Sequence, residues 1–415
     1  MTASSSGRWH IGARTPVVFV LGAFCFFSTF SIAGTQTALT LAVLIWVILV
    51  LLGKIVPPRR TAVDLPIAFF IAAALVAALL SGHRIASLVN LKNLLLIVIV
   101  YLFGWILDSR RETRACFTVL AISGAASSLY GIVVFLTARG EGALGRTPGP
   151  FSTAMTFGGV LLVLCSLFLA VGIGEGLSRR VRFAVLGSAV LVAVALFFSF
   201  TRSSWLGMLA SSITVVSLLR RRWLIVLAVF IIVGVLLLPP SYRARITSIW
   251  DPRYRTNVQR LEMLRGGWEI IKDHPWFGVG TMDLADTYRR YMPPGAVHVH
   301  GHLHNIFLQV AATMGIIGLA AFCYLFYAFF KLLIGNLRRP LDQPERAFVV
   351  GSIGASVGFI VNGLFEWNFG DAEVVMLLYL VVGANLAFAM RGGRFGGSDR
   401  SRAGRGPVRA REGNG

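Results

Sequence analysis

Apolar runs long enough to cross a bilayer recur along almost the whole of this chain. A transmembrane helix needs about 20 mostly apolar residues. Charged side chains make up only 14% of the 415 residues, against about 25% in a soluble domain. The pattern predicts an all-α polytopic membrane protein with about twelve transmembrane helices. The predicted spans are 16–33, 36–52, 65–80, 94–107, 114–137, 152–171, 183–200, 203–219, 223–238, 304–333, 348–365 and 372–390. The fourth is short, and its true start is expected nearer Ser87.

The distribution of basic residues predicts the orientation of these spans. The formal charge is +21, from 39 Lys and Arg against 18 Asp and Glu. In a soluble protein that excess would suggest nucleic acid, but here the basic residues lie in short segments between apolar runs. Short cytoplasmic loops are enriched in Lys and Arg, and long loops have little influence on orientation. We therefore expect both termini on the cytoplasmic side, membrane lipids as neighbours and no nucleic-acid partner.

The predicted organisation has four parts. Residues 1–238 hold the first nine spans, 239–303 form one long outer loop carrying short helices, and 304–390 hold the last three spans. The Gly- and Arg-rich tail, 391–415, is expected to be disordered. Apolar residues at helical spacing in the loop predict an amphipathic helix against the membrane or over the bundle. They are Val258, Leu261, Leu264, Trp268 and Ile271.

Four histidines alternate along the end of the outer loop: His298, His300, His302 and His304. In an extended strand they would share one face, as a metal site requires. We expect no metal there, because an extended run rarely surrounds one ion. His304 precedes a long apolar run and should lie at a helix N-terminus, where the helix dipole keeps the ring neutral and suited to general-base chemistry. The alternative is a helix-capping histidine without chemistry.

Arginines on the same side are the second group of candidate residues. Arg202 lies at the junction of two spans and could bind an anionic group or simply extend toward the membrane surface. Arg265 and Arg260 lie on the predicted loop helix, where Glu262 and Glu269 could pair with Arg265 instead. Arg146 is a fourth candidate with the same ambiguity.

Several classes of protein are disfavoured by what the sequence lacks. There is no P-loop for ATP, no carboxylate cluster suited to Mg²⁺ on the outer side, and no Gly-x-Ser-x-Gly elbow. Ionisable residues gather at the outer face and are scarce in the span centres, which argues against a transporter. What remains is a cationic outer site with a candidate base and no cofactor.

Four motifs resemble those of the O-antigen ligase family, part of a superfamily that also contains the O-antigen polymerases. The most specific is His304-Asn305, followed by nine residues, Gly315, two residues and Gly318. The resemblance, including the span number and the long loop, covers nearly the whole chain. The other motifs are Thr201-Arg202, the stretch from Arg265-Gly-Gly-Trp268 to His274-Pro-Trp-Phe-Gly-Val-Gly280, and Leu364-Phe365-Glu366-Trp367-Asn368 ahead of Asp371.

The resemblance implies transfer of O-antigen polysaccharide from undecaprenyl diphosphate to the lipid A–core oligosaccharide. The reaction would take place at the periplasmic face of the bacterial inner membrane, without metal or ATP. Arg202 and Arg265 would bind the donor diphosphate, and His304 would take the proton from the acceptor hydroxyl.

Three further residues are candidates for substrate binding: Arg146, Arg260 and His302. Direct displacement predicts inversion at the anomeric carbon. The alternative function is that of a polymerase, which would use the same site with a second lipid-linked glycan as acceptor. The sequence does not determine the oligomeric state.

Overall fold

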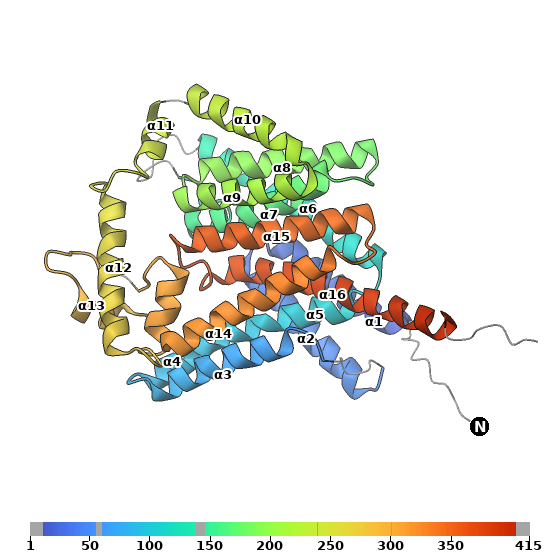
Figure 1. Ribbon diagram of the computed structural model, residues 1–415, viewed down its shortest axis with the longest axis horizontal. Helices are drawn as coiled ribbons and strands as arrows, with labels where there is room; N and C mark the ends of the chain where they lie inside the picture. The colour runs from blue at the N-terminus through green and yellow to red at the C-terminus, as the bar shows by residue number, and fades with distance from the viewer. Residues whose placement is uncertain (1–10, 55–59, 138–145, 239, 300, 404–415) are drawn as a thin grey trace, which may run out of the picture.

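Long α-helices form a bundle, and shorter helices lie across one of its ends (Figure 1). The computed structural model describes residues 11–54, 60–137, 146–238, 240–299 and 301–403. These ranges contain helices and no strand, which confirms the predicted fold class. The helices are α1 (Ile11–Phe27), α2 (Ile32–Leu51), α3 (Asp64–Leu80), α4 (Arg84–Asn90), α5 (Val98–Ile106), α6 (Arg110–Thr137), α7 (Ala154–Ile173), α8 (Arg179–Phe198), α9 (Arg202–Leu219), α10 (Leu224–Leu237), α11 (Pro240–Thr247), α12 (Arg255–Asp273), α13 (Ala285–Tyr291), α14 (Ile306–Asn336), α15 (Gln343–Gly363) and α16 (Ala372–Ala403), with 3₁₀ segments η1 (Leu91–Ile97) and η2 (Arg221–Trp223).

Each predicted span coincides with a helix. Eight helical segments in the described ranges are long and apolar enough to cross a membrane, so the count of twelve stays a prediction. The fourth span begins before Leu94, at Arg84, and its middle turn is the 3₁₀ segment η1. This agrees with the expectation of a start nearer Ser87; polar Asn90 and Asn93 interrupt the apolar run there, which explains why the run itself begins only at Leu94. Helix α16 extends to Ala403; residues 404–415 lie outside the described residues, and the disorder of the tail stays a prediction.

Helices α7, α15 and α16 form the centre of the bundle. Their residues are buried on nearly every face, from Phe157 to Val171 in α7 and from Val374 to Phe388 in α16. Small residues allow α15 to lie close to α9, because a Cβ added to Gly358 would lie 2.8 Å from the Gly207 carbonyl oxygen. The peripheral helices expose Leu, Ile, Val and Phe, as lipid-facing helices do.

Helix α14 is interrupted at Gly315, where φ is +66°. The segment after α12 lies against this interruption: Ile316 N donates to Pro275 O (2.8 Å), Val279 N to Ala312 O (3.0 Å) and Gly280 N to Thr313 O (2.9 Å). A Cβ at position 315 would collide with the Trp276 carbonyl. The glycine of the His304 signature and the His274–Gly280 stretch therefore meet in space, which explains why both occur in one sequence.

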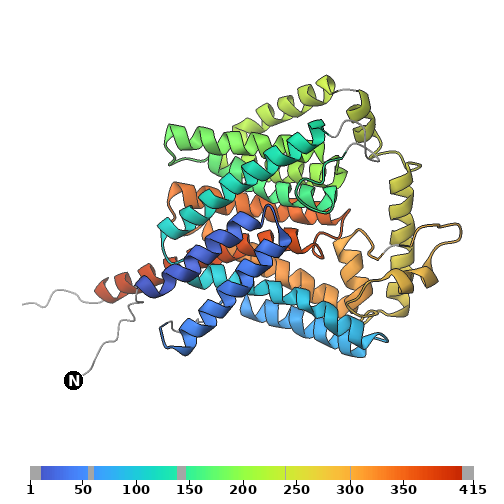
Figure 2. The same cartoon turned by 180° about the vertical axis from the view of Figure 1, so that it is seen from behind.

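Helix α12 crosses the end of the bundle (Figures 1 and 2), and its presence confirms the helical spacing in the loop. The side facing the bundle is not the predicted apolar stripe. Val258, Leu261, Leu264 and Trp268 are exposed, whereas Met263, Gly266, Gly267 and Ile270 are buried. At Gly267 an added Cβ would lie 2.8 Å from Leu303 and Leu308, so close packing depends on a residue without hydrophobic signal. The stripe is thus left free to face the membrane.

Candidate functional site

The N-terminus of α14 sets the position of His304. Asn305 is the capping residue, since its Oδ1 accepts hydrogen bonds from Phe307 N (3.0 Å) and Leu308 N (2.9 Å). The alternative of a capping histidine is therefore wrong, and the His304 ring is available for another partner. His304 has φ +46°, a left-handed conformation that is rare for a residue with a side chain. Such strain clusters at functional sites.

The partner of His304 is Glu366, from the turn between α15 and α16. His304 Nδ1 lies 2.9 Å from Glu366 Oε1. An ionised carboxylate only accepts hydrogen bonds, so Nδ1 is the donor, and in the neutral ring Nε2 is the nitrogen with the lone pair. Burial alone would raise the pKa of the Glu366 carboxyl, but the hydrogen bond from His304 and the charges of His304 and His302 hold that pKa below its usual value. The pair therefore has the geometry of a base oriented by a carboxylate.

Four arginines lie near one another, and two of them, Arg146 and Arg260, interact electrostatically with Glu366. Arg146, before α7, donates to Ser199 O (3.2 Å) and Thr201 Oγ1 (3.1 Å). Arg245, on α11, donates to Tyr254 Oη (2.8 Å), and its guanidinium lies 5.8 Å from the centroid of the Tyr254 ring. Arg202, at the start of α9, lies on the same ring, with its guanidinium 5.1 Å from the centroid. The fourth, Arg260 of α12, is half-buried. We call Arg146, Arg202, Arg245 and Arg260 the arginine cluster.

The arginine cluster carries more positive charge than the nearby carboxylate balances. Burial lowers the pKa of Arg146, the charges of Arg245 and Arg260 lower it further, and that of Glu366 raises it. Burial also lowers the pKa of Arg260, which Glu366 raises and Arg245 lowers. Arg245 Nε is buried without a hydrogen-bond partner in the described part of the chain. Phosphate oxygens would satisfy such donors and this charge.

Arg202 is already occupied by protein groups. Its Nη1 donates to Ser248 O (2.8 Å) and Ser248 Oγ (3.0 Å), and its Nη2 to Thr256 Oγ1 (2.6 Å) and Asn257 Oδ1 (2.7 Å). These bonds tie the start of α9 to the connection between α11 and α12. Arg202 thereby fixes the helices that carry Arg245 and Arg260.

Arg265 lies apart from the cluster. It is exposed on α12, and the ion pairs among the described residues join Glu269 to Lys272 rather than to Arg265. Arg260 and Arg265 are five residues apart, which is about 140° around a helix axis. The structure thus brings Arg260, rather than Arg265, to the side of Glu366.

The alternating histidines do not share one site. His298 is exposed, with Nε2 3.3 Å from Arg255 Nη2, and His300 lies outside the described residues. The His302 ring lies 4.2 Å from the His304 ring, centroid to centroid. His302, His304 and Glu366 offer donor atoms all within 4.8 Å of one another, so these three could hold a metal ion. The direct hydrogen bond between His304 and Glu366 is the competing arrangement.

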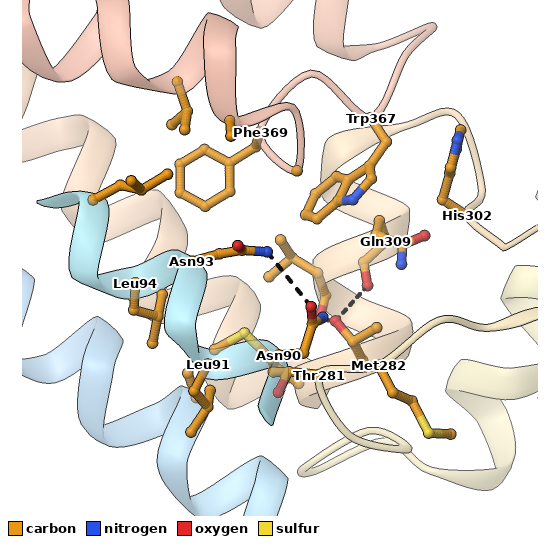
Figure 3. A pocket seen from close by; sticks show the side chains of 18 of the residues that line it. Asn90, Leu91, Asn93, Leu94, Thr281, Met282, His302, Gln309, Trp367 and Phe369 are labelled. Carbon is orange, nitrogen blue, oxygen red and sulfur yellow. Dashed lines mark hydrogen bonds between the residues drawn. The ribbon is translucent and has the colours of Figure 1, made fainter. Parts of the chain in front are cut away.

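A cavity of about 280 Å³ opens beside His302 (Figure 3). Trp367 and Phe369, from the same turn as Glu366, project into it, and Asn90, Asn93 and Gln309 also line it.

Asp371, at the end of that turn, accepts a hydrogen bond from Thr156 Oγ1 (2.9 Å). Burial and the charge of Glu373 raise the pKa of Asp371 to about 7.

Sequence reasoning missed two members of the site. Arg245 looked like one of many loop arginines, and no spacing distinguished it. Glu366 appeared only within a resembling motif, without a role, although a carboxylate beside a span end is a signal of function. Asn90 and Asn93 were also missed, although polar residues inside an apolar run carry the same signal.

The fold and the site define a multi-pass membrane protein that gathers an arginine cluster and a His–Glu pair at one end of its bundle. The family model described as O-antigen ligase matches residues 187–323, from within α8 to within α14. The match confirms the resemblance to the O-antigen ligase family, whose superfamily is glycosyltransferase-like. It includes His304 and three of the clustered arginines, whereas Arg146 and Glu366 lie outside it. No curated protein matches the chain.

Proposed function

We propose that this protein transfers O-antigen polysaccharide from undecaprenyl diphosphate to the lipid A–core oligosaccharide. The observation that carries the proposal is the His304–Glu366 pair beside an arginine cluster with excess positive charge. A lipid diphosphate is a leaving group that needs stabilisation of negative charge, and a sugar hydroxyl is a nucleophile that needs a base. The arginine cluster offers the positive charge, and the His304–Glu366 pair offers the base.

The proposed reaction is one displacement. His304 Nε2 takes the proton of the acceptor hydroxyl while the hydroxyl oxygen attacks the anomeric carbon of the donor glycan. The bond from that carbon to the diphosphate oxygen breaks, and its electron pair leaves with undecaprenyl diphosphate. Arg146, Arg245 and Arg260 stabilise this charge, and Glu366 stabilises the protonated His304. The anomeric configuration inverts, because a single displacement has no covalent intermediate.

Arg202 and Arg265 take different parts in this scheme. Arg202 positions Arg245 and Arg260 through Ser248, Thr256 and Asn257, in addition to its positive charge. Arg265, which the resemblance implies for the diphosphate, contacts the donor only if α12 rotates toward it.

Purified protein, undecaprenyl-diphosphate-linked glycan and lipid A–core in EDTA, without ATP, should yield the joined product. The measurement is the shift of lipid A–core to larger glycolipid on a gel, with a His304→Ala protein as the matched control. Extension of the lipid-linked glycan instead would identify a polymerase. Activity lost in EDTA and restored by zinc would make His302, His304 and Glu366 a metal site.

We further propose that the site faces the periplasm and that both termini are cytoplasmic. Thr247 of α11 and Ser178 before α8 are exposed and lie at opposite ends of the bundle. In intact cells a membrane-impermeant maleimide should label Thr247→Cys and leave Ser178→Cys unlabelled. The unsubstituted protein reports the background from Cys323, which is exposed. The reverse labelling pattern would contradict the periplasmic site.

A further inference from the structure

The cavity beside His302 differs in chemistry from the arginine cluster. The cavity is lined by amide, hydroxyl, carboxylate and imidazole groups, and arginine is absent from its described lining. The polar lining residues include Asn90, Asn93, Thr281, Asp283, His302, Gln309 and Thr313. The His304–Glu366 pair therefore has two different neighbours: guanidinium groups in the arginine cluster, and hydrogen-bonding groups without guanidinium in the cavity.

From this division we infer that the cavity binds the acceptor sugar whose hydroxyl attacks the donor. The inference rests on the proposed function. A diphosphate requires cations, which the cluster supplies, whereas sugar hydroxyls both donate and accept and are matched by amide and carboxylate groups. His302 lines the cavity and its ring lies 4.2 Å from the His304 ring between centroids, so a hydroxyl bound beside His302 lies near the base.

The size and apolar walls of the cavity fit one or two sugar rings. Its volume of about 280 Å³ is near the lower end of the ~300–1,000 Å³ of small-molecule sites, which combine apolar walls with few polar groups. Trp367 and Phe369 present aromatic rings to it from the turn that carries Glu366 (Figure 3). The apolar face of a sugar ring packs against such surfaces, so the ring and the orienting carboxylate are held by one turn.

The local backbone places the two asparagines together. Asn90 ends α4 and Asn93 lies in η1, which has three residues per turn, so the two side chains stand one above the other. Asn93 Nδ2 lies 3.5 Å from Asn90 Oδ1, a long contact that a ligand hydroxyl can replace. In a membrane protein, irregular backbone is tolerated where it lines a cavity. The 3₁₀ turn in a predicted span thus has a function in this reading.

The part of the cavity wall that holds Thr281 and Asp283 is fixed by hydrogen bonds within the protein. Ser81 Oγ donates to Val279 O (2.7 Å), and Thr281 Oγ1 donates to Ser87 O (3.0 Å). Leu284 N donates to Gly301 O (2.9 Å), which holds Asp283 beside the loop that carries His302. A preformed wall lowers the entropic cost of binding the acceptor.

The test is steady-state ligation by full-length protein, with lipid A–core and lipid-linked glycan varied separately. Asn90→Ala and Asn93→Ala should each raise the KM for lipid A–core about fivefold to tenfold, the loss of roughly one hydrogen bond. Asn93→Trp, which fills the mouth, should abolish ligation while binding of the donor persists. The KM for the donor should not change in either alanine variant. Lys92→Ala, exposed on the same 3₁₀ turn and outside the cavity lining, is the matched control.

Each outcome decides the inference separately from the proposed function. If the wild-type protein ligates and the asparagine variants keep a normal KM for lipid A–core, the acceptor site is elsewhere and the proposed function stands. A rise in donor KM alone would place the donor glycan in the cavity and overturn the assignment. If the wild-type protein itself forms no product with lipid A–core, the proposed function fails. Melting temperatures in detergent show whether Asn93→Trp folds; if it does not, the alanine variants decide.

Discussion

Replacing His304 by alanine is expected to lower ligation turnover by about 10²–10⁴-fold, the usual contribution of a general base. The variant should still insert, because Asn305, not His304, caps α14, but it should melt at a lower temperature than the wild type, because the buried Glu366 carboxylate loses its partner. Turnover is measured at matched membrane abundance. His298→Ala, in the same loop and exposed, is the control and should be milder. Near-normal turnover in His304→Ala would leave only a cationic diphosphate site.

A double-mutant cycle tests the role of Glu366. Glu366→Gln keeps an acceptor for His304 Nδ1 but removes the charge that stabilises the protonated ring, so turnover should fall, by less than in His304→Ala. Residues that act as a unit show non-additive effects. The double variant should therefore be no slower than His304→Ala alone. Additive losses would show that Glu366 acts mainly on Arg146 and Arg260 rather than through His304.

The second large effect is expected at Arg260. Arg260→Ala should lower kcat/KM for the lipid-linked donor by about 10²–10³-fold, as loss of one group that stabilises developing negative charge does. Arg260→Lys should recover only part, because Lys lacks the planar fork. Arg265→Ala, five residues away on the exposed side of α12, is the matched control and should stay within about threefold, since exposed charges contribute little.

The reverse result would favour the role that the resemblance implies for Arg265 and would require α12 to rotate on binding the donor. Arg202→Ala separates direct contact from positioning. It removes four hydrogen bonds to Ser248, Thr256 and Asn257, so a positioning role predicts a lower melting temperature together with lost activity. Loss of activity at an unchanged melting temperature would indicate direct contact with the diphosphate instead.

Much of the fold could be predicted because hydropathy is a local property. The length and spacing of apolar runs placed a helix at every predicted span, and the period within the loop predicted α12. The sequence left open whether the apolar stripe of α12 faces the membrane or the bundle, because Gly266 and Gly267 decide the packing by their small size, which hydropathy does not measure. The apolar run of the fourth span begins late for a related reason: Asn90 and Asn93 are polar because they line a cavity, although a start nearer Ser87 was expected.

The candidate site was predictable in its base but not in its partners. The sequence by itself determined that His304 lies just before a long helix, at the end of the bundle where arginines gather, since a signature and a charge pattern are both local. Only the tertiary structure decided that Glu366, 62 residues away, orients it. The tertiary structure also decided that Arg146, Arg245 and Arg260 interact electrostatically with one another, and that Arg265 lies on another side of α12. Helix packing and the rotation of α12 set these contacts, and they depend on the shapes of many distant side chains at once.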